Sequence, residues 1–236
     1  DVSKKFNYGI FFRELGMLLR NSSYISTCLS MLTIYASLGI LGIVATYAYI
    51  YVYELSTEQM TIAGIIKMPG VFIALPLLAL MSKWMEKRQI FMVTTLITGI
   101  FCALPNILKM LGWFPGNESS FLLIALFLPM LIGTIVTPVT SIIIDSQLVD
   151  VADVHEYQTG SRGEGVVFSV RSFAIKATSG IGGLIAGFGL EFIGFPDNAE
   201  VGKLTAETID GLLFMVGPLY LGLYLFAIFL MSFYTL

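Results

Sequence analysis

Four charged residues, Lys67, Asp145, Arg171 and Lys176, stand inside long apolar runs of the sequence. A charged side chain at the centre of a bilayer costs about 2.5–3.5 kcal/mol on insertion scales, so such a residue generally faces a partner or a water-filled cavity. If the apolar runs cross a membrane, each of the four is a candidate functional group. Their depth in the runs distinguishes them.

Lys176 is the deepest of the four. If its helix enters the bilayer near Gly165, the lysine lies about 16 Å along the helix, close to the middle of a hydrocarbon layer of about 30 Å. Residues three or four positions apart share a helix face, and the face around Lys176 is mostly small and polar. We expect this face to line a hydrophilic cavity, and we predict that Lys176 and Ser172 belong to a substrate or cation site. The other members of the face are Ser169, Phe173, Ser179, Gly180 and Gly183.

The alternative for Lys176 is a charge neutralised by a buried carboxylate on another helix, with no role in binding. The chain offers no carboxylate of equal depth, so we expect even that partner to lie outside the chain. Arg171 is only about 9 Å deep, and Asp145 lies within a turn or two of water, so both side chains can reach the interface. Lys67 lies about two turns in from the opposite side.

The first apolar run carries a second feature, a set of tyrosines. Aromatic rings with hydroxyl groups can line a site for a polar, ring-shaped ligand, and we predict Tyr35 and Tyr47 as site residues on this ground. Tyrosines near a helix end also form the aromatic belt at a membrane interface. We favour the belt for Tyr49, Tyr51 and Tyr53.

The composition supports a membrane location for all of these residues. The chain has 236 residues, of which 56% are hydrophobic and 12% are charged, and its mean hydropathy is +0.85. Soluble domains are about a quarter charged, so the chain is predicted to be an integral membrane protein whose partner is the lipid bilayer, with no surface basic enough for nucleic acid.

A helix needs about 20 apolar residues to cross the bilayer, and only helices and closed barrels satisfy the backbone there. The sequence therefore predicts an all-α membrane protein with six transmembrane helices. An entry segment at 1–23 precedes a bundle at 24–236. The predicted helices run approximately over 24–53, 60–82, 89–110, 119–147, 165–195 and 208–235.

Lysine and arginine are concentrated on one side of this bundle. Lys83, Lys87 and Arg88 lie between the second and third predicted helices, and the segment before the first helix is also basic. Because cytoplasmic loops carry the excess of these residues, we predict a multi-pass protein of the cell membrane with both termini of the segment in the cytoplasm. The charged stretch 148–164 is then a cytoplasmic loop.

Other chemistry does not assemble in the sequence. His155 is the single histidine and lies in the charged stretch, which favours a structural role. Cys28 and Cys102 lack a CxxC spacing and are expected to be buried hydrophobes. A membrane-embedded hydrolase would need a Ser–His, Asp–Asp or His–Asp pair within the apolar runs, and none is present. The chain is therefore predicted not to be an enzyme and to bind no metal.

Polar residues at fixed spacing extend from Asp150 to Lys176 in "DVADVHEYQTGSRGEG" and the following "FSVRSFAIKATSGIGGLIAG". With "FRELGMLLRN" and "YIYVYELSTEQM" upstream, this stretch resembles the glycoside–pentoside–hexuronide:cation symporter family, the melibiose-permease-like branch of the major facilitator superfamily. That family carries A-D-x-x-D-Y-G-E-[WY]-K-T-G-x-R-x-E-G between its tenth and eleventh helices. The sequence departs from it at Val149, Val154, His155 and Gln158. The matching residues are Asp150, Asp153, Glu156, Tyr157, Thr159, Gly160, Arg162, Glu164 and Gly165.

The resemblance implies that the chain is the C-terminal six-helix half of such a transporter, containing helices seven to twelve. It implies a small-molecule substrate, with sugar as the expected class, a coupling cation such as Na⁺ or H⁺, and no other cofactor. Lys176 matches the lysine of the family's eleventh helix, which lies near the cation site. The carboxylates of that site belong to the N-terminal six-helix half, which is absent from this chain.

The charged stretch then has a mechanical interpretation. Ion pairs with the opposite half would close the cytoplasmic side, and because exposed pairs contribute only about 0–1 kcal/mol each, several weak pairs suit a gate that must open. The alternative is a solvated loop that caps the neighbouring helices. The predicted gate residues are Asp150, Asp153, Glu156, Arg162 and Glu164.

The sequence thus predicts a secondary active transporter that works by alternating access, with cation-coupled sugar or glycoside symport as the expected activity. One alternative keeps the fold and changes the cargo to a lysophospholipid or an organic anion. Another is a six-helix channel or scaffold. The first residue is not Met and the start is predicted to be cytoplasmic, so we expect the chain to begin in the middle of a larger protein.

Overall fold

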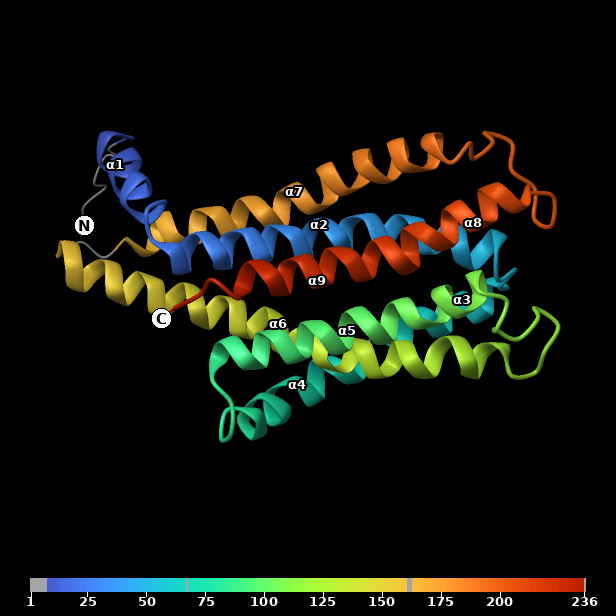
Figure 1. The fold of residues 1–236 in the computed structure, drawn as a ribbon, viewed down its shortest axis with the longest axis horizontal. Helices are drawn as coiled ribbons and strands as arrows, with labels where there is room; N and C mark the ends of the chain where they lie inside the picture. The colour runs from blue at the N-terminus through green and yellow to red at the C-terminus, as the bar shows by residue number, and fades with distance from the viewer. Residues whose placement is uncertain (1–7, 67, 161–162, 236) are drawn as a thin grey trace.

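Long helices lying side by side make up the structure, which is a computed structural model that describes residues 8–66, 68–160 and 163–235 (Figure 1). Within those residues, five helical segments are long and apolar enough to cross a membrane. The helices are α1 (Tyr8–Leu18), α2 (Ser22–Tyr51), α3 (Thr57–Ile65), α4 (Met68–Met81), α5 (Lys87–Met110), α6 (Leu122–Thr159), α7 (Glu164–Phe192), α8 (Ala206–Phe214), a π-helical turn (Met215–Leu219) and α9 (Tyr220–Met231).

Polar residues mark where the helices begin. The side chain of Asn21 accepts a hydrogen bond from the backbone N–H of Tyr24 at 3.1 Å and caps α2. Ser56 caps α3 in a capping box, and Thr205 caps α8. Such side chains satisfy backbone donors that have no partner within the helix. At the C-terminal end of α6, Gly160 adopts φ 68°, a left-handed conformation that glycine takes at low cost and that ends many helices.

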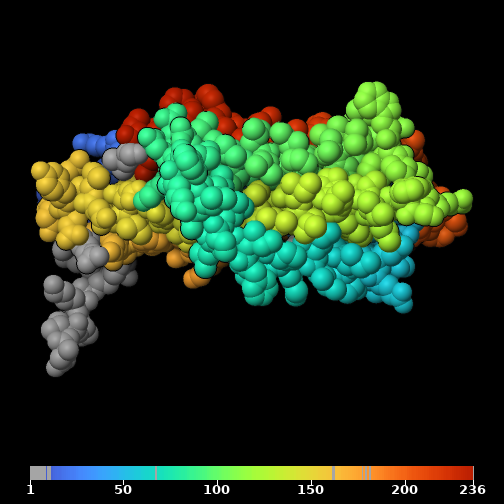
Figure 2. Space-filling view, turned by 90° about the horizontal axis from the view of Figure 1, so that it is seen from below, coloured from blue at the N-terminus to red at the C-terminus, as the bar shows by residue number. Residues whose placement is uncertain are grey.

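The long helices form a bundle in which α2 and α9 lie centrally (Figure 1). The helix α7 packs along α2 at one edge, and α5 lies between α9 and α6. The helix α4 crosses over α6 at the opposite edge, as the space-filling view shows (Figure 2). The helix α1 and the last described residues, which follow α9, lie at the same end of the bundle, which is called the N/C end below; the opposite end is the far end (Figure 1).

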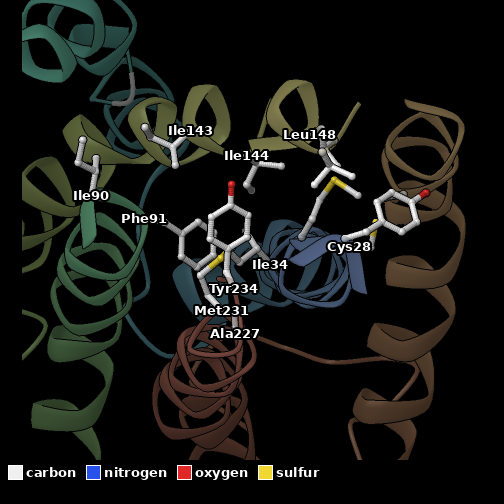
Figure 3. Packing of buried hydrophobic residues seen from close by; sticks show 14 of the residues in the cluster. Cys28, Ile34, Ile90, Phe91, Ile143, Ile144, Leu148, Ala227, Met231 and Tyr234 are labelled. Carbon is white, nitrogen blue, oxygen red and sulfur yellow. The ribbon is translucent and has the colours of Figure 1, made fainter. Parts of the chain in front are cut away.

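Two apolar clusters hold the bundle together, one toward each end. Side chains of α2, α5, α6 and α9 meet in the cluster nearer the N/C end, where Phe91, Ile144 and Met231 are almost completely buried (Figure 3). The second cluster, nearer the far end, includes Val44, Tyr53 and Leu212. In a membrane, close packing of such side chains rather than their removal from water stabilises the bundle.

Small residues allow α2 and α7 to approach closely. A Cβ atom added to Gly182 would lie 2.7 Å from the Cα of Gly39, and one added to Gly39 would lie 2.5 Å from the backbone oxygen of Thr178. Ala174 and Ala186 are buried on the same side of α7. The packing stripe therefore runs through residues 174, 178, 182 and 186, small residues at four-residue spacing that let two helix backbones approach closely.

The helices differ from the sequence prediction in four places. The predicted cytoplasmic loop 148–164 is mostly helix, because α6 continues to Thr159, roughly three turns beyond the predicted end of that span. The predicted entry segment 1–23 contains α1 and the first two residues of α2. The second predicted span is divided between α3 and α4, and the last one contains a π-helical turn.

Candidate functional site

A cavity of about 300 Å³ lies between α2, α5, α6 and the last helix. This volume is at the lower end of the range for small-molecule sites. The cavity occupies the part of the bundle nearer the far end. Its wall is formed by Leu38, Leu41, Gly42, Ala45, Thr46, Ala48, Tyr49, Thr98, Cys102, Asn106, Met130, Thr134, Thr137, Pro138, Val216 and Tyr220.

The lining combines apolar side chains with uncharged polar groups. Thr46 and Tyr49 contribute hydroxyl groups from α2, Thr134 and Thr137 contribute them from α6, and the amide of Asn106 comes from α5. No charged side chain lines this cavity among the residues that the structure describes. The arrangement suits an uncharged ligand with several hydroxyl groups and at least one apolar face, because sites of this kind combine apolar contacts with a few placed polar groups.

Local sequence explains the concave wall. Gly42, Ala45 and Thr46 follow one another on the same face of α2 at spacings of three and four residues, so little side-chain volume fills the space. On α6, a Cβ atom added to Gly133 would lie 2.7 Å from Sγ of Cys102, which shows how closely α5 and α6 approach behind the cavity.

Threonines fasten α5 to α6 below the cavity. Two bonds join the helices: the hydroxyl of Thr98 donates to the backbone oxygen of Gly133 at 3.1 Å, and Thr140 donates to the hydroxyl of Thr94 at 2.8 Å. Within α6, Thr137 donates to the same oxygen of Gly133, also at 3.1 Å. A second, smaller cavity shares Leu38, Thr98 and Thr137 with the first and continues toward the N/C end. Hydroxyl groups therefore extend from the main cavity along the α5–α6 contact.

Tyr35 and Tyr47, the two tyrosines predicted for the site, lie in different surroundings. Tyr35 lines the smaller cavity. Tyr47 packs edge-on against Phe195, with the ring centroids 5.1 Å apart, and is not among the residues of the main cavity.

Of the three tyrosines predicted for the aromatic belt, Tyr49 and Tyr53 face the inside of the bundle instead, whereas Tyr51 packs against Phe195. Tyr53 is completely buried, and its hydroxyl donates to Oδ1 of Asn106 at 2.9 Å. Tyr49 lines the main cavity, where its hydroxyl donates to the sulfur of Met130.

Lys176 and Ser172 are exposed on α7, on the side that faces away from α2. They belong to a stripe at spacings of three and four residues that also contains Ser169, Gly180, Gly183 and Gly187. A separate exposed stripe of the same helix is apolar and includes Phe173, Leu184 and Phe188. The helix thus presents one polar and one apolar surface outside its contact with α2, and Lys176 lies on the polar one.

Asp145 and Arg171, two of the four charges in the apolar runs, form an ion pair between α6 and α7. Nη2 of Arg171 lies 2.7 Å from Oδ2 of Asp145, and Nε of the same guanidinium donates to Oδ1, so the contact is bidentate. The two side chains are 29% and 38% exposed. Paired planar groups of this kind bond more strongly than single contacts. Lys67 lies outside the residues that the structure describes.

The predicted gate residues lie at the N/C end. Asp150 accepts hydrogen bonds from Nζ of Lys87, at 2.7 Å to each carboxylate oxygen, and this pair joins α6 to the start of α5 within the same bundle. Nearby, burial raises the pKa of Tyr234, and the charge of Asp150 adds to this effect. Asp153, Glu156 and Glu164 are exposed. Arg162 lies outside the described residues.

His155 has packing neighbours rather than a ligand set. Its side chain is 5% exposed, and a Cβ atom added to Gly163 would lie 2.8 Å from its ring carbon Cδ2. No group of three or more His, Cys, Asp or Glu side chains that could hold a metal ion occurs within the described ranges. Cys28 is buried as expected, whereas Cys102 lines the main cavity.

The sequence interpretation missed the cavity and its amide. Asn106 is buried between α5, the end of α2 and the π-helical turn. An amide within an apolar run is a sequence signal of a polar contact, and this signal was not used. The threonines at positions 134 and 137 of α6, and at 94 and 98 of α5, recur at three or four residues and mark the faces that meet.

Comparison with known proteins decides the class. Residues 3–236 match the family described as MFS/sugar transport protein. The chain belongs to that family. A search of curated proteins finds no match. The chain is therefore a multi-pass membrane protein of the transporter class, and its helical bundle is that of one half of a major facilitator superfamily transporter.

Proposed function

We propose that the chain is the C-terminal half of a cation-coupled sugar symporter of the glycoside–pentoside–hexuronide branch, located in the cell membrane with both termini in the cytoplasm. The observation that carries this proposal is the cavity of about 300 Å³ lined by hydroxyl and amide groups, with no charged side chain among its described residues, in a chain of the MFS/sugar transport protein family. Such a lining can bond to sugar hydroxyls while its apolar side chains contact the carbon face of a ring.

The distribution of charges supports the proposed orientation. Lys87 and Arg88 begin α5 at the N/C end, while the α7–α8 connection at the far end carries Asp197, Glu200 and one lysine, Lys203. Cytoplasmic loops carry the excess of lysine and arginine.

Lys176 has a distinct role in the proposal. The polar stripe on which it lies is separate from the main cavity, and we propose that the stripe faces the N-terminal half. A carboxylate of that half would then pair with the ammonium group of Lys176 or bind the coupling Na⁺ or H⁺, so that lysine and cation compete. The gate residues would act at the N/C end, where Asp153, Glu156 and Glu164 are exposed to such a partner.

Cys102 allows a direct test of the cavity. The thiol lines the cavity, whereas Cys28 is 7% exposed and serves as an internal control. In membranes from cells that express the protein, we expect N-ethylmaleimide to label Cys102, and we expect the transported sugar to slow this labelling in a saturable manner. Cys102→Ser identifies the labelled residue.

The panel of competitors separates the proposed cargo from its alternatives. Radiolabelled neutral monosaccharides and disaccharides are compared with uronic acids and with lysophosphatidylcholine, each with and without a Na⁺ or H⁺ gradient. Saturable, gradient-driven sugar uptake together with sugar protection of Cys102 supports the proposal. Protection by the lipid alone would indicate a changed cargo, and uptake that neither saturates nor follows a cation gradient would indicate a channel; either result contradicts it.

A further inference from the structure

The last membrane helix is interrupted where it borders the cavity. Residues Met215–Leu219 form a π-helical turn between α8 and α9, and Pro218 lies within it. Proline has no backbone N–H, and its ring displaces the carbonyl four residues earlier, so a regular helix cannot continue through it unchanged. Val216 lies in this turn, and both Val216 and Tyr220 line the cavity. π-helical turns inside longer helices occur frequently at functional sites.

The side chain of Asn106 holds this turn against α5. Nδ2 of Asn106 donates to the backbone oxygen of Val216 and to that of Cys102, each at 3.3 Å. The turn also packs closely on α5, since a Cβ atom added to Gly217 would lie 3.2 Å from Cβ of Asn106. Asn106 is 8% exposed, so water competes little for the hydrogen bonds of its side-chain amide.

The same amide also reaches the end of α2. Oδ1 of Asn106 accepts the hydroxyl proton of Tyr53 at 2.9 Å. Tyr53 is completely buried, so water does not compete for this hydrogen bond. Nζ of Lys109 lies 5.6 Å from the centroid of the Tyr53 ring and donates to Oδ1 of Asn117 at 2.8 Å. One amide therefore joins α2, α5 and the π-helical turn, and the contacts continue to the α5–α6 connection.

We propose that Asn106 is a positioning residue of the cavity. Its two donors and its acceptor fix the π-helical turn and the end of α2 at once, and they thereby set the position of the wall formed by Val216 and Tyr220. The consequence for ligand affinity rests on the proposed transport function. The effect on the shape of the cavity does not, and it can be measured without a substrate.

The first test uses the alkylation rate of Cys102, which lies one turn before Asn106 and lines the same cavity. Membranes that contain the full protein are treated with N-ethylmaleimide, and variants are compared at equal protein level. We expect Tyr53→Phe to change the rate about fivefold, the ratio that one net hydrogen bond supports, and we expect Asn106→Leu to change it more. Tyr51→Phe is the matched control, since Tyr51 packs on Phe195 away from the cavity wall.

An altered alkylation rate of Cys102 in these variants supports the proposal. If Tyr53→Phe and Asn106→Leu are both alkylated at the wild-type rate, the proposal is overturned. If Asn106→Leu does not accumulate in the membrane, Tyr53→Phe decides alone. Pro218→Ala is an independent variant, because it changes the π-helical turn itself and leaves Asn106 in place. We expect it also to change the alkylation rate of Cys102.

The second test separates this inference from the proposed function. With any sugar that the wild-type protein accumulates, Tyr53→Phe and Asn106→Leu are expected to raise the apparent KM, with a smaller change in the maximal rate. An unchanged KM alongside wild-type uptake overturns the positioning role. Wild-type protein that accumulates no sugar contradicts the proposed function instead, and the alkylation result then stands by itself.

Discussion

The two ends of the bundle are built in different ways. Toward the N/C end, apolar side chains of α2, α5, α6 and α9 fill the centre, and two ion pairs join the helices around it. Toward the far end, α2, α5, α6 and the π-helical turn surround a cavity whose described lining is uncharged. One end is thus closed by packing and charge, and the other leaves space beside hydroxyl groups.

This difference suggests a division of labour within one transporter half. The bidentate contact between Arg171 and Asp145 is partly buried, so it joins α6 and α7 more strongly than a single exposed pair would, and it suits a contact that persists. Uncharged hydroxyl groups can exchange one hydrogen-bond partner for another at small net cost, so they suit contacts with a ligand that must leave again. The predictions below test this division, beginning with the largest expected effect.

Gly182 lies between the two ends of the bundle, where α7 contacts α2 at Gly39 near the middle of both helices. In Gly182→Ala, the added methyl group would meet the Cα of Gly39 at 2.7 Å, and the backbones must separate. Overpacking of this kind costs about 1–3 kcal/mol, which lowers the Tm by about 3–10 °C in a protein of this size. Thermal unfolding in detergent measures the change.

Gly180→Ala is the matched control on the same helix. A Cβ atom at Gly180 has no neighbour within 4 Å, and alanine favours a helix more than glycine does. We expect its Tm to be unchanged or slightly higher. Equal losses in the two variants would contradict the assigned packing register.

Arg171→Met tests the charged pair of the closed end. The change leaves Asp145 without its bidentate partner between α6 and α7. We expect initial uptake rates to fall about tenfold at equal protein level, the loss that about 1.4 kcal/mol in a barrier produces. The reversed pair, Arg171→Asp with Asp145→Arg, should recover part of the rate, and a single variant with wild-type uptake would show that the pair is dispensable.

Lys176→Ala tests whether the polar stripe of α7 acts apart from the cavity. We expect the variant to insert normally and to lose or change the dependence of uptake on the Na⁺ or H⁺ gradient, because the ammonium group no longer competes with the cation. Uptake at a series of cation concentrations measures this. Ser169→Ala on the same stripe is the comparison, and normal cation-driven uptake by Lys176→Ala would refute the assignment of the stripe to the cation site.

Lys87→Met is expected to have the smallest effect. The side chains of Lys87 and Asp150 are 41% and 35% exposed, so solvent screens their attraction. Pairs of this kind contribute about 0–1 kcal/mol, a Tm change of less than about 4 °C. A larger loss, measured by thermal unfolding beside Lys83→Met as a control, would show that the N/C end depends on this contact more than its exposure indicates.

Hydropathy located the apolar parts of α2, α5 and α6, but not the extension of α6 beyond Gln147. The end of α6 reads as a loop because charged residues follow Gln147, and hydropathy measures apolar content rather than helical period. A helical signal was nevertheless present, since Leu148, Val151, Ala152 and His155 recur at spacings of three and four residues and are all buried. A prediction that used this helical period would have extended the fourth predicted helix beyond Gln147.

The cavity was less accessible to sequence reasoning than the fold. Lys176 was conspicuous because charge is rare in an apolar run, whereas Thr98, Thr134 and Asn106 come from different helices and become neighbours only through packing. The π-helical turn also depends on this context, because a proline within a helix can produce a kink, a break or a change of helical type.

The length of α6 has a consequence for experiment. At 38 residues the helix is about 57 Å long, nearly twice the thickness of the hydrocarbon layer. The same rod that contributes Met130 and Thr134 to the cavity therefore continues into water, where Tyr157 is 93% exposed. A fluorescent or spin probe attached at Tyr157→Cys would act as a pointer outside the bilayer, and its movement would report on ligand entry without any label inside the membrane.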